Sequence, residues 1–231
     1  MESALYVTGT DTGIGKTVAS CTCLHALRGR GLRAIGMKPV ASGCERTAEG
    51  WRNDDALRLQ AASQPRPDYA DLNPYALPLP LAPELAAEDA GVAVRPQPIR
   101  EAFDRLQARA DVVVVEGVGG WAAPLSATLD QADLVRLLNL PVLLVVGLRL
   151  GCLNHARLSV QAIEASGARL AGWIASEIDP AMDCRDENFA LLQARLPAAC
   201  WGRLPHAPQP DPAVLATHLQ LPAAFAPSRR P

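Results

Sequence analysis

The segment that decides the fold is Gly9-Thr10-Asp11-Thr12-Gly13-Ile14-Gly15-Lys16-Thr17, which separates the apolar run 4–7 from a helix-forming stretch that begins near Lys16. A strand that leads through small residues into a helix leaves backbone N–H groups unpaired. These groups point into one concavity, where the helix dipole also attracts an anion. Lys16 adds a charge for the β- and γ-phosphates, and the Thr17 hydroxyl can coordinate Mg²⁺. The segment therefore predicts a phosphate-binding loop.

The spacing of this loop departs from the general P-loop pattern. That pattern has a glycine five residues before Gly15, where this chain has Thr10, and the glycine occurs one position earlier, at Gly9. A chance Gly-Lys-Thr in an ordinary loop is the alternative interpretation. The flanking strand and helix, in the correct order, favour the phosphate site.

Length and composition are typical of one α/β domain with a sizeable core. The chain has 231 residues, of which 20% are charged, and a net charge of −2. This balance provides no basic field for nucleic acid. Because no apolar run approaches the roughly 20 residues of a membrane span and the first residues lack a basic leader, we expect a cytoplasmic protein with no membrane partner.

The six cysteines, at positions 21, 23, 44, 152, 184 and 200, lack paired C-x-x-C spacing, and we expect reduced thiols. On a helix Cys21 and His25 would share a face, but no third ligand is near, so zinc is not expected. His25 is expected to be packed rather than catalytic.

Predicted strands and helices alternate along the chain. Beyond the first strand, strands are expected at 32–37, 111–116, 141–147, 169–175 and 199–204, and helices at 18–28, 56–62, 99–110, 130–140, 154–165 and 186–196. This order predicts a single P-loop-like α/β domain over residues 1–221, with a doubly wound, mostly parallel sheet and helices on both faces. Residues 64–98 are expected to be irregular apart from a short helix near 84–89, and residues 222–231 to be disordered.

Polar residues follow two predicted strands at their carboxyl ends, the edge where open α/β sheets bind ligands. Lys38 and Ser42 follow the second strand, although Lys38 could also be a solvated lysine before a turn. Glu116 follows four valines, where the Walker-B acid of a nucleotide enzyme would meet Mg²⁺. The glycines after Glu116, Gly119 among them, let the backbone approach a ligand.

Two helix starts carry further candidate groups. Asn53 or Asp54 can cap the helix at 56–62, which leaves a carboxylate such as Asp55 free. The helix expected from about Asn154 offers free N–H groups as a second anion site.

Several segments together resemble the dethiobiotin synthetase family, ATP-dependent enzymes of biotin synthesis. They are VTGTDT at 7–12 with GKT at 15–17, KPVASG at 38–43, RNDD at 52–55, NPY at 73–75, VEG at 115–117 with GGW at 119–121, and LGC at 150–152 with NHA at 154–156. A glycine at position 9 departs from the general P-loop motif but matches the pattern of this family.

The resemblance implies a homodimer that takes 7,8-diaminopelargonic acid, CO₂ and ATP with Mg²⁺ and forms dethiobiotin. The implied catalytic residues are Thr12, Lys16 and Lys38, and the implied Mg²⁺ ligands are Thr17, Asp55 and Glu116. The implied nucleotide contacts are Gly13, Ile14, Gly15, Lys16, Thr17, Val18, Asp55, Glu116, Ser176 and Pro205. The implied substrate contacts are Ser42, Lys38, Gly119, Cys152, Leu153 and Asn154. The turn at 150–154 would take the substrate carboxylate, from the partner subunit.

Two positions depart from the family pattern. Ser176 stands where the family often has an asparagine that faces the nucleotide base, and Asn188 stands where it often has a tyrosine near the substrate. Base selectivity and part of the substrate pocket depend on these positions.

Two other functions share features of this sequence. A nucleotide-driven switch ATPase, like partition or division-site proteins, would carry a second lysine early in the loop, where this chain has Asp11. An amidating domain related to cobyrinate synthesis would need a glutaminase domain with a cysteine nucleophile. The synthetase interpretation is the one we carry forward.

Overall fold

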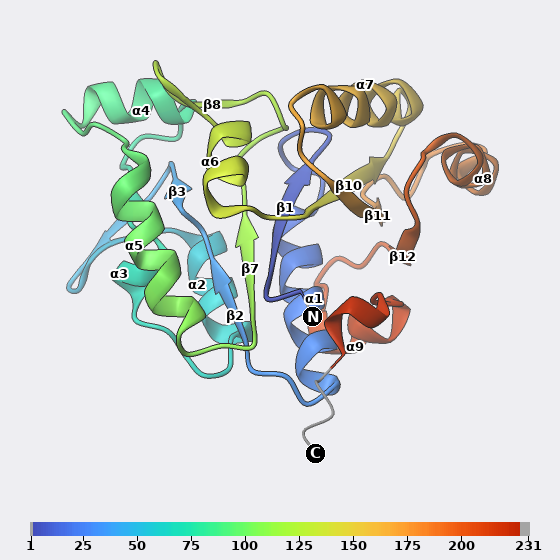
Figure 1. Ribbon diagram of the computed structural model, residues 1–231. Coiled ribbons are helices and arrows are strands. Elements are labelled where there is room, and N and C mark those ends of the chain that lie inside the picture. Colours follow the sequence, from blue (N-terminus) through green and yellow to red (C-terminus); the bar gives the residue numbers. More distant parts are fainter. Residues whose placement is uncertain (1, 227–231) are drawn as a thin grey trace.

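A six-stranded parallel sheet forms the centre of the computed structural model, which describes residues 2–226 (Figure 1). The strand order is β12-β11-β10-β1-β7-β2. The strands of this sheet are β1 (Ala4–Gly9), β2 (Ala34–Met37), β7 (Val112–Glu116), β10 (Val142–Leu148), β11 (Leu170–Glu177) and β12 (Cys200–Leu204). The predicted doubly wound α/β fold is confirmed.

Helices cover both faces of the sheet, as the alternation of strands and helices predicts. They are α1 (Lys16–Gly29), α2 (Asp54–Ala62), α3 (Tyr69–Leu72), α4 (Pro83–Asp89), α5 (Pro96–Gln107), α6 (Gln131–Leu138), α7 (Cys152–Ala165), α8 (Arg185–Arg195) and α9 (Pro212–Leu215), with single 3₁₀ turns at Ala216–His218 and Ala223–Phe225. Side chains of α5, α6, α7 and α8 pack on one face, and side chains of α1, α2 and α9 pack on the other.

The central strands are apolar because both of their faces are buried. In β7, Val113 and Val115 pack with one helical layer, whereas Val112 and Val114 pack with the other. Every residue of β1, β2, β7 and β10 is buried. Burial on both faces explains why these strands lack an alternating polar pattern and are easily recognised as apolar runs.

Some elements differ from the expected ones. Helix α7 begins at Cys152, two residues before the predicted start, so Cys152, Leu153 and Asn154 form its first turn. Three pairs of short strands were not predicted: β3 (Val40–Ala41) with β6 (Tyr75–Ala76), β4 (Glu45–Thr47) with β5 (Gly50–Arg52), and β8 (Pro124–Ser126) with β9 (Leu129–Asp130). Strands of two or three residues are too short to show a periodicity.

The expected disorder from residue 222 is wrong for residues 222–226. Phe225 is buried and its ring lies edge-on to Trp201, with centroids 5.8 Å apart. The Arg30 guanidinium donates to the carbonyl oxygen of Pro222 at 2.9 Å. One aromatic anchor and one arginine therefore hold this segment on the domain. Residues 227–231, the rest of the expected tail, lie outside the described residues.

Within residues 2–226 no helix is both long enough and apolar enough to cross a membrane. The six cysteines are free thiols, and four of them are buried. Burial raises the pKa of Cys21 and of Cys23 to about 12, so neither is a reactive thiolate at neutral pH.

Candidate active site

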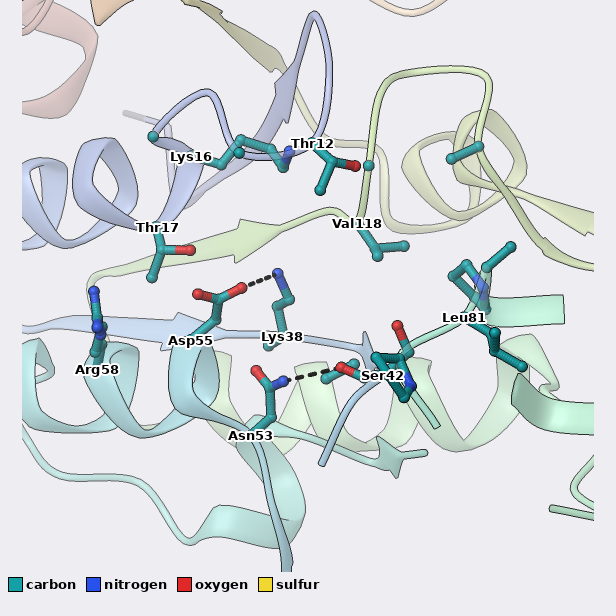
Figure 2. A pocket seen from close by; sticks show the side chains of 18 of the residues that line it. Thr12, Lys16, Thr17, Lys38, Ser42, Asn53, Asp55, Arg58, Leu81 and Val118 are labelled. Atoms are coloured by element: carbon teal, nitrogen blue, oxygen red, sulfur yellow. Dashed lines mark hydrogen bonds and ion pairs between the residues drawn. The ribbon is translucent and has the colours of Figure 1, made fainter. Parts of the chain in front are cut away.

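A cleft of about 660 Å³ lies at the carboxyl edge of the sheet, beside the phosphate loop (Figure 2). The predicted site residues that line it are Thr12, Gly13, Gly15, Lys16, Thr17, Val18, Lys38, Ser42, Asp55 and Gly119. They come from the loop after β1, the first turn of α1, the segment after β2, the start of α2 and the loop after β7. The cleft thus gathers groups that are up to about a hundred residues apart, because parallel strands end at the same edge.

The phosphate loop needs glycine at three positions. Gly13 and Gly15 have φ angles of 73° and 86°, in the left-handed region that favours glycine. A Cβ on Gly9 would lie 2.7 Å from Ile14 Cδ1 and 3.0 Å from Lys16 Cγ. A larger residue at position 9 would therefore displace the side chains of Ile14 and Lys16, which lie directly against Gly9.

Lys16 lies across the loop and is largely buried. Its ammonium donates to the carbonyl oxygen of Asp11 at 2.7 Å. Burial, with the neighbouring Lys38 cation, lowers the pKa of Lys16 to about 8. A phosphate bound beside Lys16 would oppose this effect, because a nearby anion favours the charged form of a lysine.

Lys38 is 4% exposed and lies between two carboxylates. Its Nζ is 2.6 Å from Glu116 Oε1 and 3.2 Å from Asp55 Oδ2, and it also donates to the carbonyl oxygen of Gly117 at 3.3 Å. Burial alone would lower the pKa of Lys38, but Glu116 and Asp55 outweigh burial and hold the pKa above its ordinary value. Lys38 is therefore a fixed cation, and the interpretation as a solvated lysine is wrong.

Glu116 is fully buried at the end of β7, and only one of its two carboxylate oxygens is hydrogen-bonded within residues 2–226. Its Oε1 accepts from Lys38 and from the Thr17 hydroxyl at 2.9 Å, whereas its Oε2 has no hydrogen-bond partner among the described residues. Asp55 is 43% exposed at the cleft; burial would raise its pKa, but the Lys38 cation and the Thr17 hydroxyl lower it overall.

This donor set fits Mg²⁺. Residues 2–226 contain no cluster of three or more His, Cys, Asp or Glu side chains that could hold a metal ion. Mg²⁺ does not need such a cluster, because it is held by one or two carboxylates together with waters and substrate phosphates. Asp55, the free oxygen of Glu116 and the Thr17 hydroxyl match that requirement.

Two asparagines support the cleft in ways that were only partly predicted. Asn53 caps α2 by accepting from the Ala56 N–H at 3.2 Å, and its amide donates to the Ser42 carbonyl at 3.2 Å (Figure 2). Asn73, which sequence reasoning gave no role, donates to the Lys38 carbonyl at 2.6 Å. In the sequence, these two asparagines were marked only by their places in the segments RNDD at 52–55 and NPY at 73–75. Both asparagines hold the backbone of a residue that lines the cleft.

The predicted substrate contacts of α7 do not reach this cleft within one chain. Cys152, Leu153 and Asn154 are absent from its lining. They form the first turn of α7 after Gly151, whose φ of 93° is left-handed, and Leu150 beside them is 92% exposed. An ion pair between Arg149 and Asp11 joins this turn to the phosphate loop.

The predicted base contacts also lie apart from the cleft. Ser176 is buried against the phosphate loop, so close that a Cβ on Gly15 would be 2.5 Å from its Oγ. Pro205 follows β12 on the surface, and the Ile14 side chain is buried in the core. Asn188, in the first turn of α8, donates to the carbonyl of Cys184, the residue before the helix, at 2.8 Å.

The protein has a parallel sheet, a glycine-containing phosphate loop with Lys16, and an acidic residue, Glu116, at the Walker-B position. These features define a P-loop nucleotide-binding α/β protein. The model of a family described as AAA domain matches residues 3–214. The chain is 68% identical to the ATP-dependent dethiobiotin synthetase BioD of Xanthomonas euvesicatoria, over 95% of this chain and 98% of that protein. It is 66% identical to the protein of the same name from Xylella fastidiosa, over 94% and 96%. The chain belongs to the family of ATP-dependent dethiobiotin synthetases.

Solved structures of distant proteins share the fold alone. The MinD cell division protein of Aquifex aeolicus superposes with a TM-score of 0.54 at 15% identity, over 89% of this chain and 83% of that one. The signal recognition particle receptor FtsY of Elizabethkingia anophelis gives 0.57 at 16% identity, over 97% of this chain but 63% of that one.

Proposed function

We propose that the protein is an ATP-dependent dethiobiotin synthetase that acts on 7,8-diaminopelargonic acid, CO₂ and ATP. One amine captures CO₂ as a carbamate and releases a proton. A carbamate oxygen takes the γ-phosphoryl group from ATP, which leaves as ADP. The second amine then attacks the carbonyl carbon, expels phosphate, loses a proton and closes the ureido ring of dethiobiotin.

The observation that carries this proposal is the setting of Lys38. It is a buried cation, held by Glu116 and Asp55, and it lines the same cleft as Lys16. The carbamate oxygen is itself the nucleophile, so the reaction needs no nucleophile from the protein. It needs fixed charges near a phosphoryl group in transfer, and two lysines in one cleft suit that need. The high identity to named synthetases supports the same activity.

We assign the roles as follows. Thr12 and Lys16 bind the phosphates of ATP, and Lys38 with Ser42 binds the carbamate. Asp55, Glu116 and Thr17 hold Mg²⁺, which supplies positive charge to the phosphate oxygens when bound. The spare oxygen of Glu116 is the feature of this chain that supports the metal role.

We propose further that the active unit is a homodimer. The substrate ends in a carboxylate, and the first turn of α7 offers N–H groups that no side chain caps. Since this turn does not line the chain's own cleft, the carboxylate would be bound by the partner subunit. Leu150 is exposed beside the turn, and a partner subunit that covers the turn would remove its apolar side chain from water.

We propose that the enzyme works in the cytoplasm. Its six cysteines are free thiols, as suits a reducing compartment. Recovery of the chain mainly outside the cytoplasmic fraction of the cell would contradict this location.

The test is to follow dethiobiotin by mass spectrometry and phosphate release in the same reaction. With diamine, bicarbonate and ATP·Mg²⁺ we expect one phosphate for each dethiobiotin formed, and incorporation of one labelled carbon from ¹³C-bicarbonate. Omitting either diamine or CO₂ should stop phosphate release. A switch ATPase would hydrolyse ATP without regard to either, and that outcome would overturn the proposed function.

A further inference from the structure

The loop of residues 117–123 follows Glu116 and forms one wall of the cleft through Val118, Gly119 and Ala123. It contains neither helix nor strand. Backbone polar groups of such a segment need partners wherever they are buried. In this protein the partners come largely from one side chain, that of Gln131.

Gln131 is the first residue of α6 and is completely buried. Its Nε2 donates to the Gly120 carbonyl at 2.5 Å and lies 3.3 Å from the carbonyls of Trp121 and Ala123. Its Oε1 accepts from the Val118 N–H at 3.2 Å. One amide group therefore binds the loop near both of its ends.

The Tyr6 hydroxyl donates to the same Oε1 at 2.8 Å. Tyr6 is buried on β1, the strand that leads into the phosphate loop. The Val118 N–H can only donate and the carbonyls can only accept, so the oxygen of the Gln131 amide must face Val118 and the NH₂ group must face the carbonyls. Burial and the Glu116 carboxylate raise the pKa of Tyr6 far above its ordinary value, so the hydroxyl stays a donor.

Loop 117–123 packs tightly against the side chains of Tyr6 and Gln131 at Gly117. A Cβ on Gly117 would lie 2.3 Å from Gln131 Oε1 and 2.7 Å from the Tyr6 hydroxyl oxygen. The Gly117 carbonyl in turn accepts from the Lys38 ammonium at 3.3 Å. Hydrogen bonds and packing therefore run without a break from the phosphate-loop strand, through Gln131 and the loop, to Lys38.

We propose that Tyr6 and Gln131 are positioning residues, which hold loop 117–123 against the cleft and keep Lys38 in place relative to the phosphate loop. They touch no reacting atom and act through the loop. The inference rests on the proposed function, because the reaction it concerns is the phosphorylation and ring closure assigned to this cleft.

The central test is Gln131→Met, which keeps an unbranched side chain but removes every hydrogen bond to the loop. We expect kcat for dethiobiotin formation to fall on the order of tenfold or more, as small misplacements of reacting groups do. The KM for ATP should stay within about a factor of two, since the phosphate loop binds the triphosphate. Amide hydrogen exchange at residues 118–123 should become faster.

The double variant Tyr6→Phe/Gln131→Met separates positioning from stability. In Gln131→Met the Tyr6 hydroxyl is left buried without a partner, which destabilises the fold, and removing it as well should recover much of the lost stability. The loop still lacks its partners, so kcat and the exchange of residues 118–123 should stay impaired although Tm recovers. Recovery of kcat together with Tm would reduce the pair to a structural role and overturn the proposal.

The matched control is Gln60→Met. Gln60 is another buried glutamine, on α2, whose amide donates to the Pro67 carbonyl at 3.0 Å, and it does not line the cleft. This variant should lose stability with kcat and loop exchange unchanged. If Gln131→Met likewise kept parental kcat and loop exchange, the proposal would be wrong.

The double variant Tyr6→Phe/Gln131→Met serves if the single methionine variant does not fold, because it leaves no buried hydroxyl without a partner. Faster exchange at residues 118–123 with lower kcat is then expected, and parental values of both would contradict the inference. A parent protein that makes no dethiobiotin would instead refute the proposed function, and the exchange measurements would still report on the loop.

Discussion

At the scale of single residues, the use of lysine in this chain is unusual. It contains two lysines among its 22 basic residues, and both line the cleft. Everywhere else the basic residue is arginine. Lysine is a compact point charge whose pKa responds to burial, whereas arginine stays charged and binds in a fixed fork. The two lysines differ accordingly, since the pKa of Lys16 is lowered and that of Lys38 is raised.

Removing the Lys16 charge should abolish most of the activity without unfolding the protein. We expect Lys16→Ala to lower kcat by about 10²-fold or more, roughly 3 kcal/mol of transition-state stabilisation. Within residues 2–226 the hydrogen bond of the Lys16 ammonium is to the Asp11 carbonyl of its own loop, so Tm should change little. Dethiobiotin formation and thermal unfolding measure the two effects, and near-normal turnover would remove the basis of the proposed roles.

The pKa of Lys16 predicts its chemical reactivity. An amine acylates only when deprotonated, and the pKa of about 8 means that this form grows as pH rises through 8. A lysine-selective acylating reagent should therefore modify Lys16, with a midpoint near pH 8, and spare Lys38. ATP should protect Lys16, because a bound polyanion favours the cation and raises the pKa. Peptide mass spectrometry over a series of pH values measures how much of each lysine is labelled. Preferential labelling of Lys38 would contradict the assignment.

Loss of a carboxylate from the proposed metal site should raise the Mg²⁺ requirement. Hard cations prefer anionic oxygen, so Asp55→Asn and Glu116→Gln should need several times more Mg²⁺ for half-maximal activity. Glu116→Gln should also lower Tm, because Glu116 is a partner of the buried Lys38. Asp55→Asn is the cleaner variant, since Asp55 is partly exposed.

Asp54→Asn is the matched control for the Mg²⁺ titration. Asp54 precedes Asp55 on α2, is 85% exposed and pairs with Arg58. Its variant should titrate with Mg²⁺ as the parent does. If Asp55→Asn behaved in the same way as this control, Asp55 would have no part in metal binding.

At the scale of elements, the ends of β11 and β12 bear on which nucleotide is used. Ser176 is held under the phosphate loop, and the Glu177 carboxylate pairs with Arg203 and Arg185. Neither side chain offers the paired donor and acceptor with which an asparagine can match adenine. We therefore expect kcat/KM to favour ATP over CTP, GTP and UTP by about tenfold, far less than a satisfied polar pocket gives.

Kinetics with the four triphosphates at subsaturating concentration test this selectivity. Ser176→Ala is the control, and it should leave the ratios unchanged within about a factor of two, because the triphosphate is held by the phosphate loop. A preference for ATP above about a thousandfold would show that other groups, such as backbone near Pro205, distinguish the base.

At the scale of the whole molecule, the separation between the cleft and the α7 turn predicts sites shared by two subunits. Lys16→Ala removes the phosphate charge of one cleft. Leu153→Pro removes one N–H from the first turn of α7, where the N–H groups have no acceptor within the helix. Each variant alone should be nearly inactive. Equal mixing should restore about a quarter of parental activity, because half the dimers are mixed and each has one intact site.

Leu153→Ala, which keeps the N–H, is the control for this mixing experiment and should remain active. Failure of every mixing ratio to restore activity would favour sites contained in single subunits. The oligomeric state is tested separately by Leu150→Asp, which should weaken the dimer in sedimentation. Val214→Asp, at another exposed apolar residue, should not.

Much of this architecture could be predicted from the sequence. The buried strands, such as β7 with its four valines, and the amphipathic α5 were recognised because burial on two faces or one stripe leaves a direct pattern in the residues. The glycine loop with Lys16 and Thr17 was recognised because its chemistry is local. The pairs of two- and three-residue strands were not predicted, and α7 begins two residues earlier than expected. Segments of two or three residues are too short to show a periodicity.

What the sequence by itself determined is the fold class, the phosphate loop and which polar residues follow which strands, because each depends on neighbours within one turn or one strand. Only the tertiary structure decided that Lys38 is a buried cation between Glu116 and Asp55, that Gln131 holds loop 117–123, and that the α7 turn lies outside the chain's own cleft. These facts depend on the register of β1, β2 and β7 and on contacts between side chains that are far apart in the sequence. A local sequence pattern contains no information on such contacts.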